Sequence, residues 1–355
     1  MAVEFQTNIP LAPYTTFGVG GPAELFAECR QIGEIREALD EAGRRSLPVL
    51  VLGGGSNLLV SDTGFAGLVI RVAVPGVALS RAGREAILSA GAGVEWDSLV
   101  ACAVKGGFAG IECLSGIPGS VGATPVQNVG AYGQEVSQCV EEVEALDAAT
   151  GKCLRFKGAQ CAFAYRTSRF KTVDRDRYVI TRVSFRLRRG SPKSPRYDEL
   201  LRALDGRGGL EGLEPRQALA RIRETVLDIR RSKSMLIDPD DPDTRSAGSF
   251  FLNPVLSPAE FLDLKARWTA SGGQGEVPSF DAAEGKIKVP AAWLVEQAGF
   301  SKGMKRGGAG ISHRHALALV NAGGPAKDLI ALAETIEAGV CGRFGIQLER
   351  EVRTV

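Results

Sequence analysis

Apolar residues between positions 23 and 52 follow two different spacings. Residues 23–28 form a short run typical of a strand. Ile32, Ile35 and Leu39 then recur at the intervals of an amphipathic helix. The apolar run 48–52 is flanked by glycines and is typical of a buried strand. A strand, a helix and a strand in this order predict the βαβ unit of an α/β domain.

The pattern changes after about residue 75. Strand-like runs at 77–79 and 86–89 precede a helix-like segment at 96–105. Residues 183–187 alternate apolar and polar side chains, which is the period of a half-buried strand. We therefore expect this middle region to be α+β. Further strands are expected at 58–60 and 68–72.

An amphipathic helix is expected after the loop-like residues 190–195. Its apolar positions at 219, 222, 226 and 229 keep helical spacing, and Pro215 stands in the expected first turn. The basic exterior of this helix does not by itself indicate an anionic ligand, since charged helix faces are usually solvated. The last third predicts a strand pair around Phe250 and residues 317–320, a helix at 329–340 and a strand at 346–352.

The composition excludes several classes of protein. The chain has 355 residues, 44% hydrophobic and 24% charged, which is ordinary for a globular fold. Its net charge of +2 gives no electrostatic reason to expect nucleic acid. It has no apolar run long enough to cross a membrane and no secretory signal pattern at its N-terminus. Seven irregularly spaced cysteines do not suggest a disulfide framework, and together these features predict a cytoplasmic protein.

Two features stand out: 44 glycines and only 2 histidines. His313 and His315 are separated by one residue, and the motifs of zinc sites are absent, so we expect no metal centre. On a strand the two histidines would share a face, which makes a metal pair conceivable, but surface or structural roles are favoured. Acid–base chemistry must therefore depend mostly on other side chains.

The first glycine cluster follows the buried strand at 48–52. Gly53, Gly54 and Gly55 are followed by Ser56 and Asn57. Successive glycines let backbone N–H groups approach an anion closely, which is typical of a phosphate-binding nest. The spacing matches neither the dinucleotide fingerprint nor the Walker A loop. A tight strand-to-turn connection explains the same residues equally well.

The second cluster combines glycines with a proline and small polar residues. A rigid loop with so little side-chain bulk suits a flat or phosphorylated ligand, although an ordinary extended loop is the alternative. Two such loops in one chain are more than folding requires. The residues expected at the ligand are Ser115, Gly116, Ile117, Pro118, Gly119, Ser120, Gly122 and Ala123.

These clusters belong to a set of ordered blocks that covers nearly the whole chain. GGGSN followed by LLV, then SGIPGSVGA and QNVGAYG, resembles the flavin-binding half of the UDP-N-acetylenolpyruvoylglucosamine reductase (MurB) family. Because the matching blocks come from separate regions, the resemblance is specific. The other blocks are YTTFGVGG at 14–21, YRTSRF at 165–170, SAGSFFLNP at 246–254 and LEREVR at 348–353.

The resemblance implies an oxidoreductase with non-covalent FAD and with NADPH as hydride donor. Its substrate would be the UDP-sugar enolpyruvyl ether, reduced to UDP-N-acetylmuramate for peptidoglycan and cell-wall synthesis, and hence for cell shape and division. The implied fold class is α+β, with a two-part FAD-binding module of the vanillyl-alcohol-oxidase-like type and a smaller α/β substrate domain. The expected divisions are residues 1–74, joined by a C-terminal strand at about 342–355, then 75–227, and 228–341 as the substrate domain.

By the same resemblance, Arg166, Ser249 and Glu351 are the expected catalytic residues. Arg166 would hold a carboxylate through paired hydrogen bonds. Ser249 would donate a proton to C2, and Glu351 would assist at the carboxyl side if it is protonated or orients a donor. Singly, each residue has an ordinary alternative: a surface ion pair, a turn serine and a solvated glutamate. Glu349 lies two residues before Glu351, and the family pattern selects Glu351, although Arg350 stands where a smaller residue or proline is expected.

Contacts with the UDP-sugar are expected from Tyr197, Lys233, Asn253 and Gln297, by resemblance to the longer subclass of the family. For Tyr197 the alternative is an aromatic that anchors a loop. Two other functions remain open: an oxygen-using oxidase of the same fold, and a nucleotide-binding module without chemistry. The sequence leaves the oligomeric state open, and a monomer is plausible.

Overall fold

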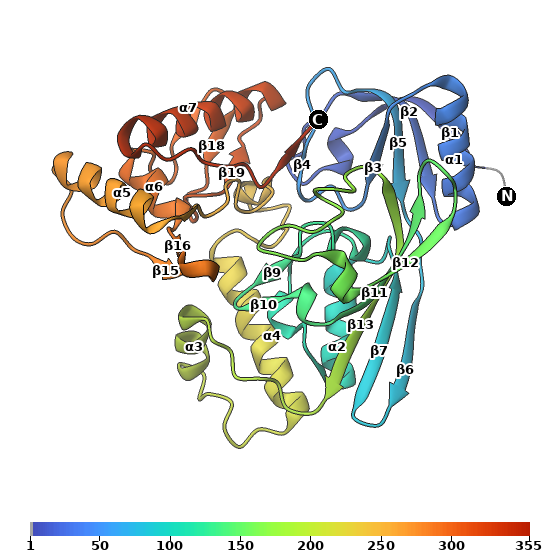
Figure 1. The fold of residues 1–355 in the computed structure, drawn as a ribbon, viewed down its shortest axis with the longest axis horizontal. Helices are drawn as coiled ribbons and strands as arrows, with labels where there is room; N and C mark the ends of the chain where they lie inside the picture. The colour runs from blue at the N-terminus through green and yellow to red at the C-terminus, as the bar shows by residue number, and fades with distance from the viewer. Residues whose placement is uncertain (1–2) are drawn as a thin grey trace. The chain divides into compact units, whose positions relative to one another are not determined.

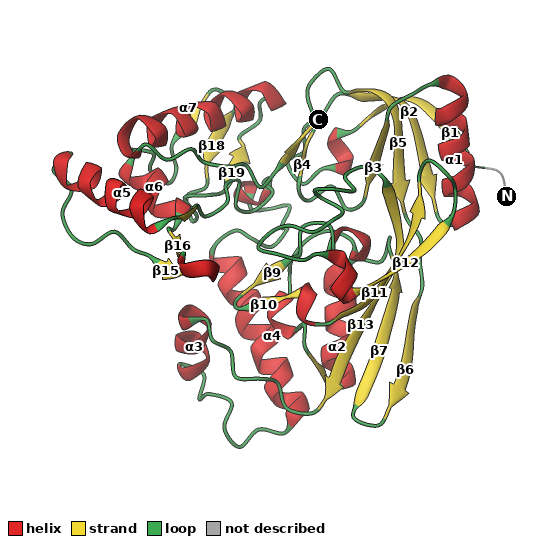
Figure 2. Cartoon of the chain, viewed as in Figure 1, coloured by secondary structure: helices red, strands yellow, loops and turns green. Residues whose placement is uncertain are grey.

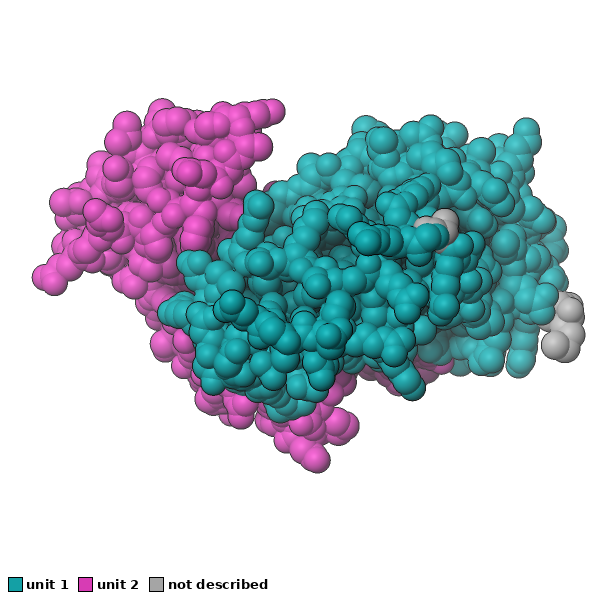
Figure 3. Space-filling view, turned by 90° about the horizontal axis from the view of Figure 1, so that it is seen from below, with its two compact units in different colours: residues 1–9, 22–55, 65–236 teal, residues 10–21, 56–64, 237–355 magenta. Residues whose placement is uncertain are grey.

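The computed structural model describes residues 3–355 and divides them into two compact units, coloured separately in Figure 3. Of the described residues, unit 1 comprises 3–9, 22–55 and 65–236, and unit 2 comprises 10–21, 56–64 and 237–355. Helices and sheets occur in both units (Figure 2), which confirms the expected α+β class. The division of the chain into three parts is not the same as these two units and stays a prediction; its boundary at 227–228 falls within a helix, Pro215–Ser232.

The N-terminal part of unit 1 contains the predicted strand–helix–strand (Figure 1). A four-stranded sheet has the order β1-β2-β5-β3, and β5 pairs in parallel with both β2 and β3. The two strands of the predicted unit are therefore not neighbours, because β5 lies between them. Helix α1 begins with Glu34 bonded to the backbone N–H of Gln31 and ends at Ser46 in the left-handed conformation. The bounds are β1 Phe5–Pro10, β2 Pro22–Cys29, α1 Ile32–Arg45, β3 Val49–Leu52 and β5 Phe65–Val72.

In the rest of unit 1, the largest element is an antiparallel sheet. Its order is β12-β11-β13-β7-β6, and β8 also pairs with β13. Val183, Phe185 and Leu187 of β13 are fully buried, as the alternation predicts, and Trp96 packs against Phe185. Helices α2 and α4 contact each other, and α4 begins with Pro215 in its first turn. The bounds are β6 Val77–Ala82, β7 Glu85–Gly91, α2 Trp96–Gly106, β8 Phe108–Ala109, β9 Gly130–Ala131, β10 Gln134–Glu135, β11 Val140–Asp147, β12 Cys153–Lys157, β13 Tyr178–Arg189, α3 Asp198–Asp205 and α4 Pro215–Ser232.

Unit 2 packs helices around small sheets and one apolar core. The predicted helix at 329–340 is the centre of α7, whose apolar side chains are buried together with Phe250, Phe251 and Trp268. The bounds are β4 Leu58–Leu59, β14 Val255–Leu256, α5 Pro258–Ala270, β15 Phe280–Asp281, β16 Ile287–Lys288, α6 Ala291–Gln297, β17 Lys305–Arg306, β18 Ala309–Ile311, β19 Leu319–Asn321, α7 Ala326–Phe344 and β20 Arg353–Thr354.

The C-terminal segment differs from its prediction. The strand expected at 346–352 is wrong as a regular element, because only Arg350 forms a bridge there, to Phe251. The regular strand of this segment is instead β20, Arg353–Thr354, which pairs in parallel with β4 of the same unit. None of the helices within residues 3–355 has the length and apolar character needed to span a bilayer.

Candidate active site

The two glycine clusters of unit 1 lie in direct contact. A Cβ atom on Gly54 would come within 2.6 Å of the Gly119 Cα, and one on Gly53 would come within 2.6 Å of the Ser120 Oγ. The bare backbone at Gly53 and Gly54 therefore has a structural reason, since any side chain would push the loops apart. The structure places the two clusters next to each other, and the contact of these glycines with a cofactor stays a prediction.

The second glycine loop is fixed at Gly116 by charged side chains. Gly116 has a φ of 71°, and its N–H donates to Asp97 Oδ1 at 2.6 Å. Arg223 donates two hydrogen bonds to the Asp97 carboxylate at 2.6 and 2.7 Å, and Arg230 Nε donates to the Gly116 carbonyl at 3.0 Å. Burial alone would raise the pKa of Asp97, but the bonds from Arg223 and Gly116 outweigh it and lower the pKa. Helix α4 thus holds this loop in place.

The other end of the loop is held by backbone hydrogen bonds. Trp96 N–H donates to the Gly119 carbonyl at 3.0 Å, and Val121 N–H donates to the Val94 carbonyl at 2.8 Å. A Cβ on Gly122 would lie 2.5 Å from the Ala92 Cβ. A loop tied at both ends is preorganised, so little conformational entropy remains to be lost when it binds a ligand.

Ser120 carries the one sign of a missing partner in this loop. Its hydroxyl is buried, and no residue within the described range 3–355 forms a hydrogen bond with it. A buried hydroxyl without a partner costs roughly 1–3 kcal/mol, so a ligand that supplies an acceptor would bind favourably there. The oxygen atoms of a dinucleotide diphosphate are such acceptors, and these residues therefore fit FAD.

Arg166 lies in the loop between β12 and β13. Its φ is 53°, a left-handed conformation that is uncommon for arginine. Its Nη2 donates to the Gly130 carbonyl at 2.6 Å, and Lys171 Nζ donates to the Arg166 carbonyl at 3.1 Å. A Cβ on Gly130 would lie 3.1 Å from the Arg166 Nη1, so the missing side chain of Gly130 leaves room for the guanidinium.

The loop around Gly130 contributes residues for which the sequence assigned no role. Asn128 has a φ of 47°, and its side-chain N–H groups donate to Glu135 Oε2 at 2.8 Å and to the Ala164 carbonyl at 3.0 Å. Asn128 therefore connects the Gly130 loop to the segment just before Arg166. The QNVGAYG block was the available signal, although local periodicity gave no indication of the partner of its asparagine.

Ser249 and Glu351 belong to paired segments of unit 2. Glu351 N–H donates to the Phe250 carbonyl at 2.9 Å, and Phe250 N–H donates to the Leu317 carbonyl at 2.8 Å. The Phe250 ring is fully buried, which anchors the backbone next to Ser249. The structure thus brings the segments of Ser249 and Glu351 together within one unit, whereas Arg166 belongs to unit 1.

The structure gives a reason for the arginine at position 350, where the family pattern has a smaller residue or proline. Arg350 donates to both carboxylate oxygens of Glu337 in α7, at 2.6 and 2.9 Å. This bidentate pair fixes the segment just before Glu351. Glu349 is exposed while Glu351 is half-buried, which favours Glu351 between the two glutamates. Asn57 strengthens the same segment, because its Nδ2 donates to the Glu351 carbonyl at 3.0 Å.

The residues expected at the UDP-sugar fall into two groups. In unit 1, Lys233 at the end of α4 forms an ion pair of 2.6 Å with Glu199, and the exposed Tyr197 packs edge-on against Tyr132. Tyr197 is 46% exposed, and the burial of the rest of its side chain raises its pKa. The negative charges of Glu199 and Asp198 add to this effect. In unit 2, the Asn253 side-chain oxygen accepts a hydrogen bond of 2.9 Å from Ala291 N–H at the start of α6, and Gln297 ends that helix.

The two histidines have structural partners. His313 Nδ1 lies 3.2 Å from Asp243 Oδ2, which also accepts a hydrogen bond from Ser312 Oγ. His315 Nδ1 accepts a bond of 3.1 Å from Leu317 N–H. Within residues 3–355, no group of three or more histidine, cysteine, aspartate or glutamate side chains could hold a metal ion.

Comparisons with known proteins place this site in a class. The family model described as an FAD binding domain matches residues 23–157, which contain both glycine loops. The chain is thus an FAD-dependent enzyme of the oxidoreductase class. The family model of the UDP-N-acetylenolpyruvoylglucosamine reductase C-terminal domain matches residues 240–355, which contain Ser249 and Glu351.

Full-length relatives define the family. The UDP-N-acetylenolpyruvoylglucosamine reductase of Thermobifida fusca is 48% identical, over 99% of this chain and 98% of the relative. That of Streptomyces avermitilis is 47% identical, over 98% of this chain and 94% of the relative. The crystal structure of the same reductase (MurB) from Thermus caldophilus matches with a TM-score of 0.67 and 26% identity, covering 99% of this chain and 98% of that one. This chain belongs to the UDP-N-acetylenolpyruvoylglucosamine reductase family.

Proposed function

We propose that this chain reduces the enolpyruvyl ether of UDP-N-acetylglucosamine to UDP-N-acetylmuramate, with NADPH as hydride donor. The observation that carries the proposal is the 48% identity over 99% of the chain to a reductase named for that substrate. Substrate specificity depends on many contacts, so similarity over the full length is stronger support than one shared motif.

FAD is the cofactor that the glycine loops fit. When bound, FAD would supply the hydride chemistry between NADPH and the enolpyruvyl group. The proposed cofactor-binding residues are those of the loops 53–57 and 115–123. Ser120 supports this assignment because its buried hydroxyl needs an acceptor.

Arg166 is proposed to bind the substrate carboxylate. Hydride addition at C3 develops negative charge at C2, and that charge spreads onto the carboxylate. A fixed guanidinium stabilises such charge better than mobile water does, because it needs no reorganisation during the reaction. The Gly130 carbonyl, 2.6 Å from Arg166 Nη2, holds this guanidinium in one orientation.

Ser249 is proposed to deliver the proton that completes the reduction at C2. The N–H of its neighbour Phe250 is bonded to the Leu317 carbonyl, so the backbone is constrained on the C-terminal side of the serine. A fixed hydroxyl can protonate a basic carbon, although a free one is a poor acid. Glu351 is proposed to assist at the carboxyl side of the substrate, as an acid or through a donor that it orients.

The UDP part is proposed to contact Tyr197, Lys233, Asn253 and Gln297. Lys233 is the cation in this set, and its ion pair with Glu199 leaves the ammonium on a half-buried side chain at the end of α4. Diphosphate binding would compete with Glu199 for that ammonium. Weaker substrate binding in Lys233→Met, at unchanged NADPH reduction, is the expected sign of this contact.

The cytoplasm is the proposed site of action, with a role in supplying the cell wall and thereby in cell shape and division. The seven cysteines, all within residues 3–355, carry free thiols, which suits a reducing compartment.

The function is tested by separating its half-reactions in the FAD-loaded protein without oxygen. NADPH should bleach the flavin absorbance, and the UDP-linked enolpyruvyl substrate should then restore it, with UDP-N-acetylmuramate as the product by mass spectrometry. Rapid reoxidation by oxygen alone, with no product from the UDP substrate, would instead identify an oxidase. Bound FAD that NADPH does not reduce would identify a module without chemistry. A colourless protein that cannot be reconstituted with FAD contradicts the proposal.

A further inference from the structure

The segment that carries Arg166 has few regular hydrogen bonds of its own. Between the short helical turn Gly158–Cys161 and the start of β13 at Tyr178, the chain runs through turns and a single bridge between Ala164 and Thr167. Such a segment loses substantial conformational entropy when it adopts one conformation. The two backbone hydrogen bonds between Ala164 and Thr167 close a tight turn at Arg166, and such a turn accommodates its φ of 53°. Contacts from side chains are needed to hold this turn in one place.

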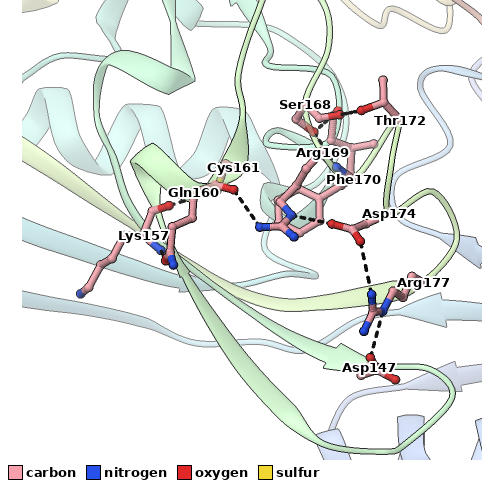
Figure 4. Close-up of polar contacts among 11 residues, drawn as sticks. Asp147, Lys157, Gln160, Cys161, Ser168, Arg169, Phe170, Thr172, Asp174 and Arg177 are labelled. Carbon is pink, nitrogen blue, oxygen red and sulfur yellow. Dashed lines mark hydrogen bonds and ion pairs between the residues drawn. The ribbon is translucent and has the colours of Figure 1, made fainter.

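A row of alternating charges lies along this segment (Figure 4). Arg169 Nε is 2.5 Å from Asp174 Oδ2, Arg177 Nη1 is 3.6 Å from Asp174 Oδ1, and Arg177 Nε is 3.2 Å from Asp147 Oδ2. Asp147 ends β11 and accepts hydrogen bonds from the N–H groups that follow it. The row therefore starts on the sheet and reaches Arg169 at its other end.

Of the ion pairs in this row, Arg169–Asp174 is the one in which both side chains are mostly buried, although the Asp147 side chain is itself only 5% exposed. The Asp174 side chain is 8% exposed and that of Arg169 is 26% exposed, whereas Arg177 is 56% exposed. Arg169 also donates to the Gln160 carbonyl at 2.9 Å and lies over the Phe156 ring at 4.6 Å. Ion pairs that are largely removed from water are costly to break from one side, because the remaining charge stays buried.

The Arg169–Asp174 ion pair and a backbone hydrogen bond close the same turn, residues 169–174. Asp174 N–H donates to the Arg169 carbonyl at 2.9 Å, so backbone and side chains join the same two residues. Lys171 lies inside this turn, and its Nζ donates to the Arg166 carbonyl at 3.1 Å. Ser168, between them, is fixed by a bond of 2.6 Å from its hydroxyl to the Val126 carbonyl. The turn thus connects Asp174 to the backbone of Arg166 through Lys171.

We propose that Arg169, Asp174 and Lys171 are positioning residues for Arg166. The Arg169–Asp174 pair fixes the turn at residues 169–174, and this turn places the Lys171 ammonium at the Arg166 carbonyl. That contact holds the turn at Arg166 in place and keeps its guanidinium at Gly130. This inference rests on the proposed function of Arg166 as the ligand of the substrate carboxylate. Its consequence is specific: loosening the pair should impair the step in which substrate is reduced and leave the reduction of the flavin unaffected.

Asp174→Asn is the main test, because it removes the charge and keeps the shape. Asp176→Asn is the matched control: it is the same substitution in the same segment, Asp176 is 49% exposed, and asparagine tolerates its left-handed φ of 60°. In Asp174→Asn, flavin reoxidation by the UDP substrate should slow by about tenfold or more, since small displacements of a binding group have large kinetic effects. Flavin reduction by NADPH should remain within about twofold in both variants.

Further variants separate positioning from general damage. Asp174→Glu retains the charge and should recover most of the reoxidation rate. Lys171→Met leaves the ion pair intact, so a slowing like that of Asp174→Asn would place the effect in the bond to the Arg166 carbonyl. Equal slowing of both half-reactions in Asp174→Asn, or a rate equal to that of Asp176→Asn, overturns the proposal.

Hydrogen exchange supplies a readout that needs no turnover. Peptides covering residues 164–174 should exchange faster in Asp174→Asn than in the native chain or in Asp176→Asn, because local opening becomes less costly. Unchanged exchange overturns the proposal. If the native chain fails to react with the UDP substrate, the proposed function fails and the effect on catalysis fails with it. If Arg166→Ala slows reoxidation and Asp174→Asn does not, the positioning role alone is wrong.

Discussion

The guanidinium of Arg166 donates a hydrogen bond to the backbone carbonyl of Gly130, with Nη2 and the oxygen 2.6 Å apart. Gly130 belongs to β9 and Arg166 to the loop between β12 and β13. The carbonyl accepts the hydrogen bond that holds the half-buried Arg166 side chain, and Gly130 itself is buried. A glycine at position 130 makes this approach possible because a side chain there would meet the guanidinium.

Gly130→Ala should therefore displace Arg166. The new Cβ would lie 2.8 Å from the Glu135 Cγ, 2.9 Å from the Gln134 carbonyl oxygen and 3.1 Å from the Arg166 Nη1. We expect flavin reoxidation by the UDP substrate to slow by roughly tenfold, while NADPH reduction stays near the native rate. Stopped-flow absorbance of the flavin measures both steps.

Gly43→Ala is the control for that substitution. A Cβ on Gly43 meets nothing within 4 Å, and the residue lies in the last turn of α1, where alanine is favoured over glycine by at most about 1 kcal/mol. Both half-reactions should be native in this variant. Native reoxidation in Gly130→Ala as well would show that the contact between Arg166 and Gly130 does not orient the guanidinium.

Ser249→Ala tests the proton donor. Because the proton is needed only when substrate is reduced, flavin bleaching by NADPH should be nearly unchanged, and reoxidation by the substrate should slow by about 10²-fold or more. Single-turnover stopped-flow measurements in ordinary and heavy water separate the two steps. A proportional loss in both would contradict the assignment of Ser249 as the donor.

Much of the scaffold was predictable from local spacing. The helix at Pro215–Ser232 follows from apolar positions at helical intervals and a proline in the first turn, and β13 follows from the alternating apolar and polar side chains at 183–187. These signals depend on neighbours a few residues apart in the chain, which is the range over which periodicity is informative.

The interactions that build the site depend on contacts distant in sequence, and periodicity does not report them. The left-handed backbone at Arg166 has no glycine to signal it. It lies in the turn that Ala164 and Thr167 close, and Gly130 and Lys171 hold the residue in place there. The strand expected at 346–352 failed for a related reason. Its apolar alternation reflects burial in the unit 2 core, while its backbone pairs only locally with the Phe250–Leu252 segment.

Ser120→Ala should affect the protein without cofactor and the FAD-loaded protein in opposite directions. Without FAD, the substitution removes a buried hydroxyl that has no partner within residues 3–355, so stability should be equal to or above that of the native chain. With FAD, it removes a hydrogen bond to a charged group, so the Kd for FAD should rise by about ten- to a hundredfold. Flavin fluorescence titration and thermal unfolding measure the two effects.

The comparison for Ser120 is Ser115→Ala. The Ser115 hydroxyl already donates to the Glu112 carbonyl at 2.7 Å, so its loss should destabilise the cofactor-free protein by about 1 kcal/mol. An unchanged Kd for FAD in Ser120→Ala would remove Ser120 from the cofactor site.

Asp97→Asn tests how firmly the second glycine loop is held, and its effect should depend on pH. Burial opposes ionisation of Asp97, but the bonds from Arg223 and the Gly116 N–H lower its pKa below the ordinary value of 3.8. A carboxylate with a lower pKa in the folded chain stabilises the fold fully above its unfolded pKa, and this contribution is lost as the pH falls through the folded pKa. At neutral pH, Asp97→Asn should lower the free energy of unfolding by roughly 1–3 kcal/mol, because Arg223 loses its ionic partner. The difference from the native chain should persist from about pH 7 to 5 and shrink below about pH 4.

Asp228→Asn is the control within unit 1: its pairs with Arg207 and Arg231 are solvent-exposed, so its effect should stay below about 1 kcal/mol. Urea unfolding midpoints across this pH range measure both variants, and a difference for Asp97→Asn that grows as the pH falls would show that the carboxylate does not stabilise the loop in its ionised form.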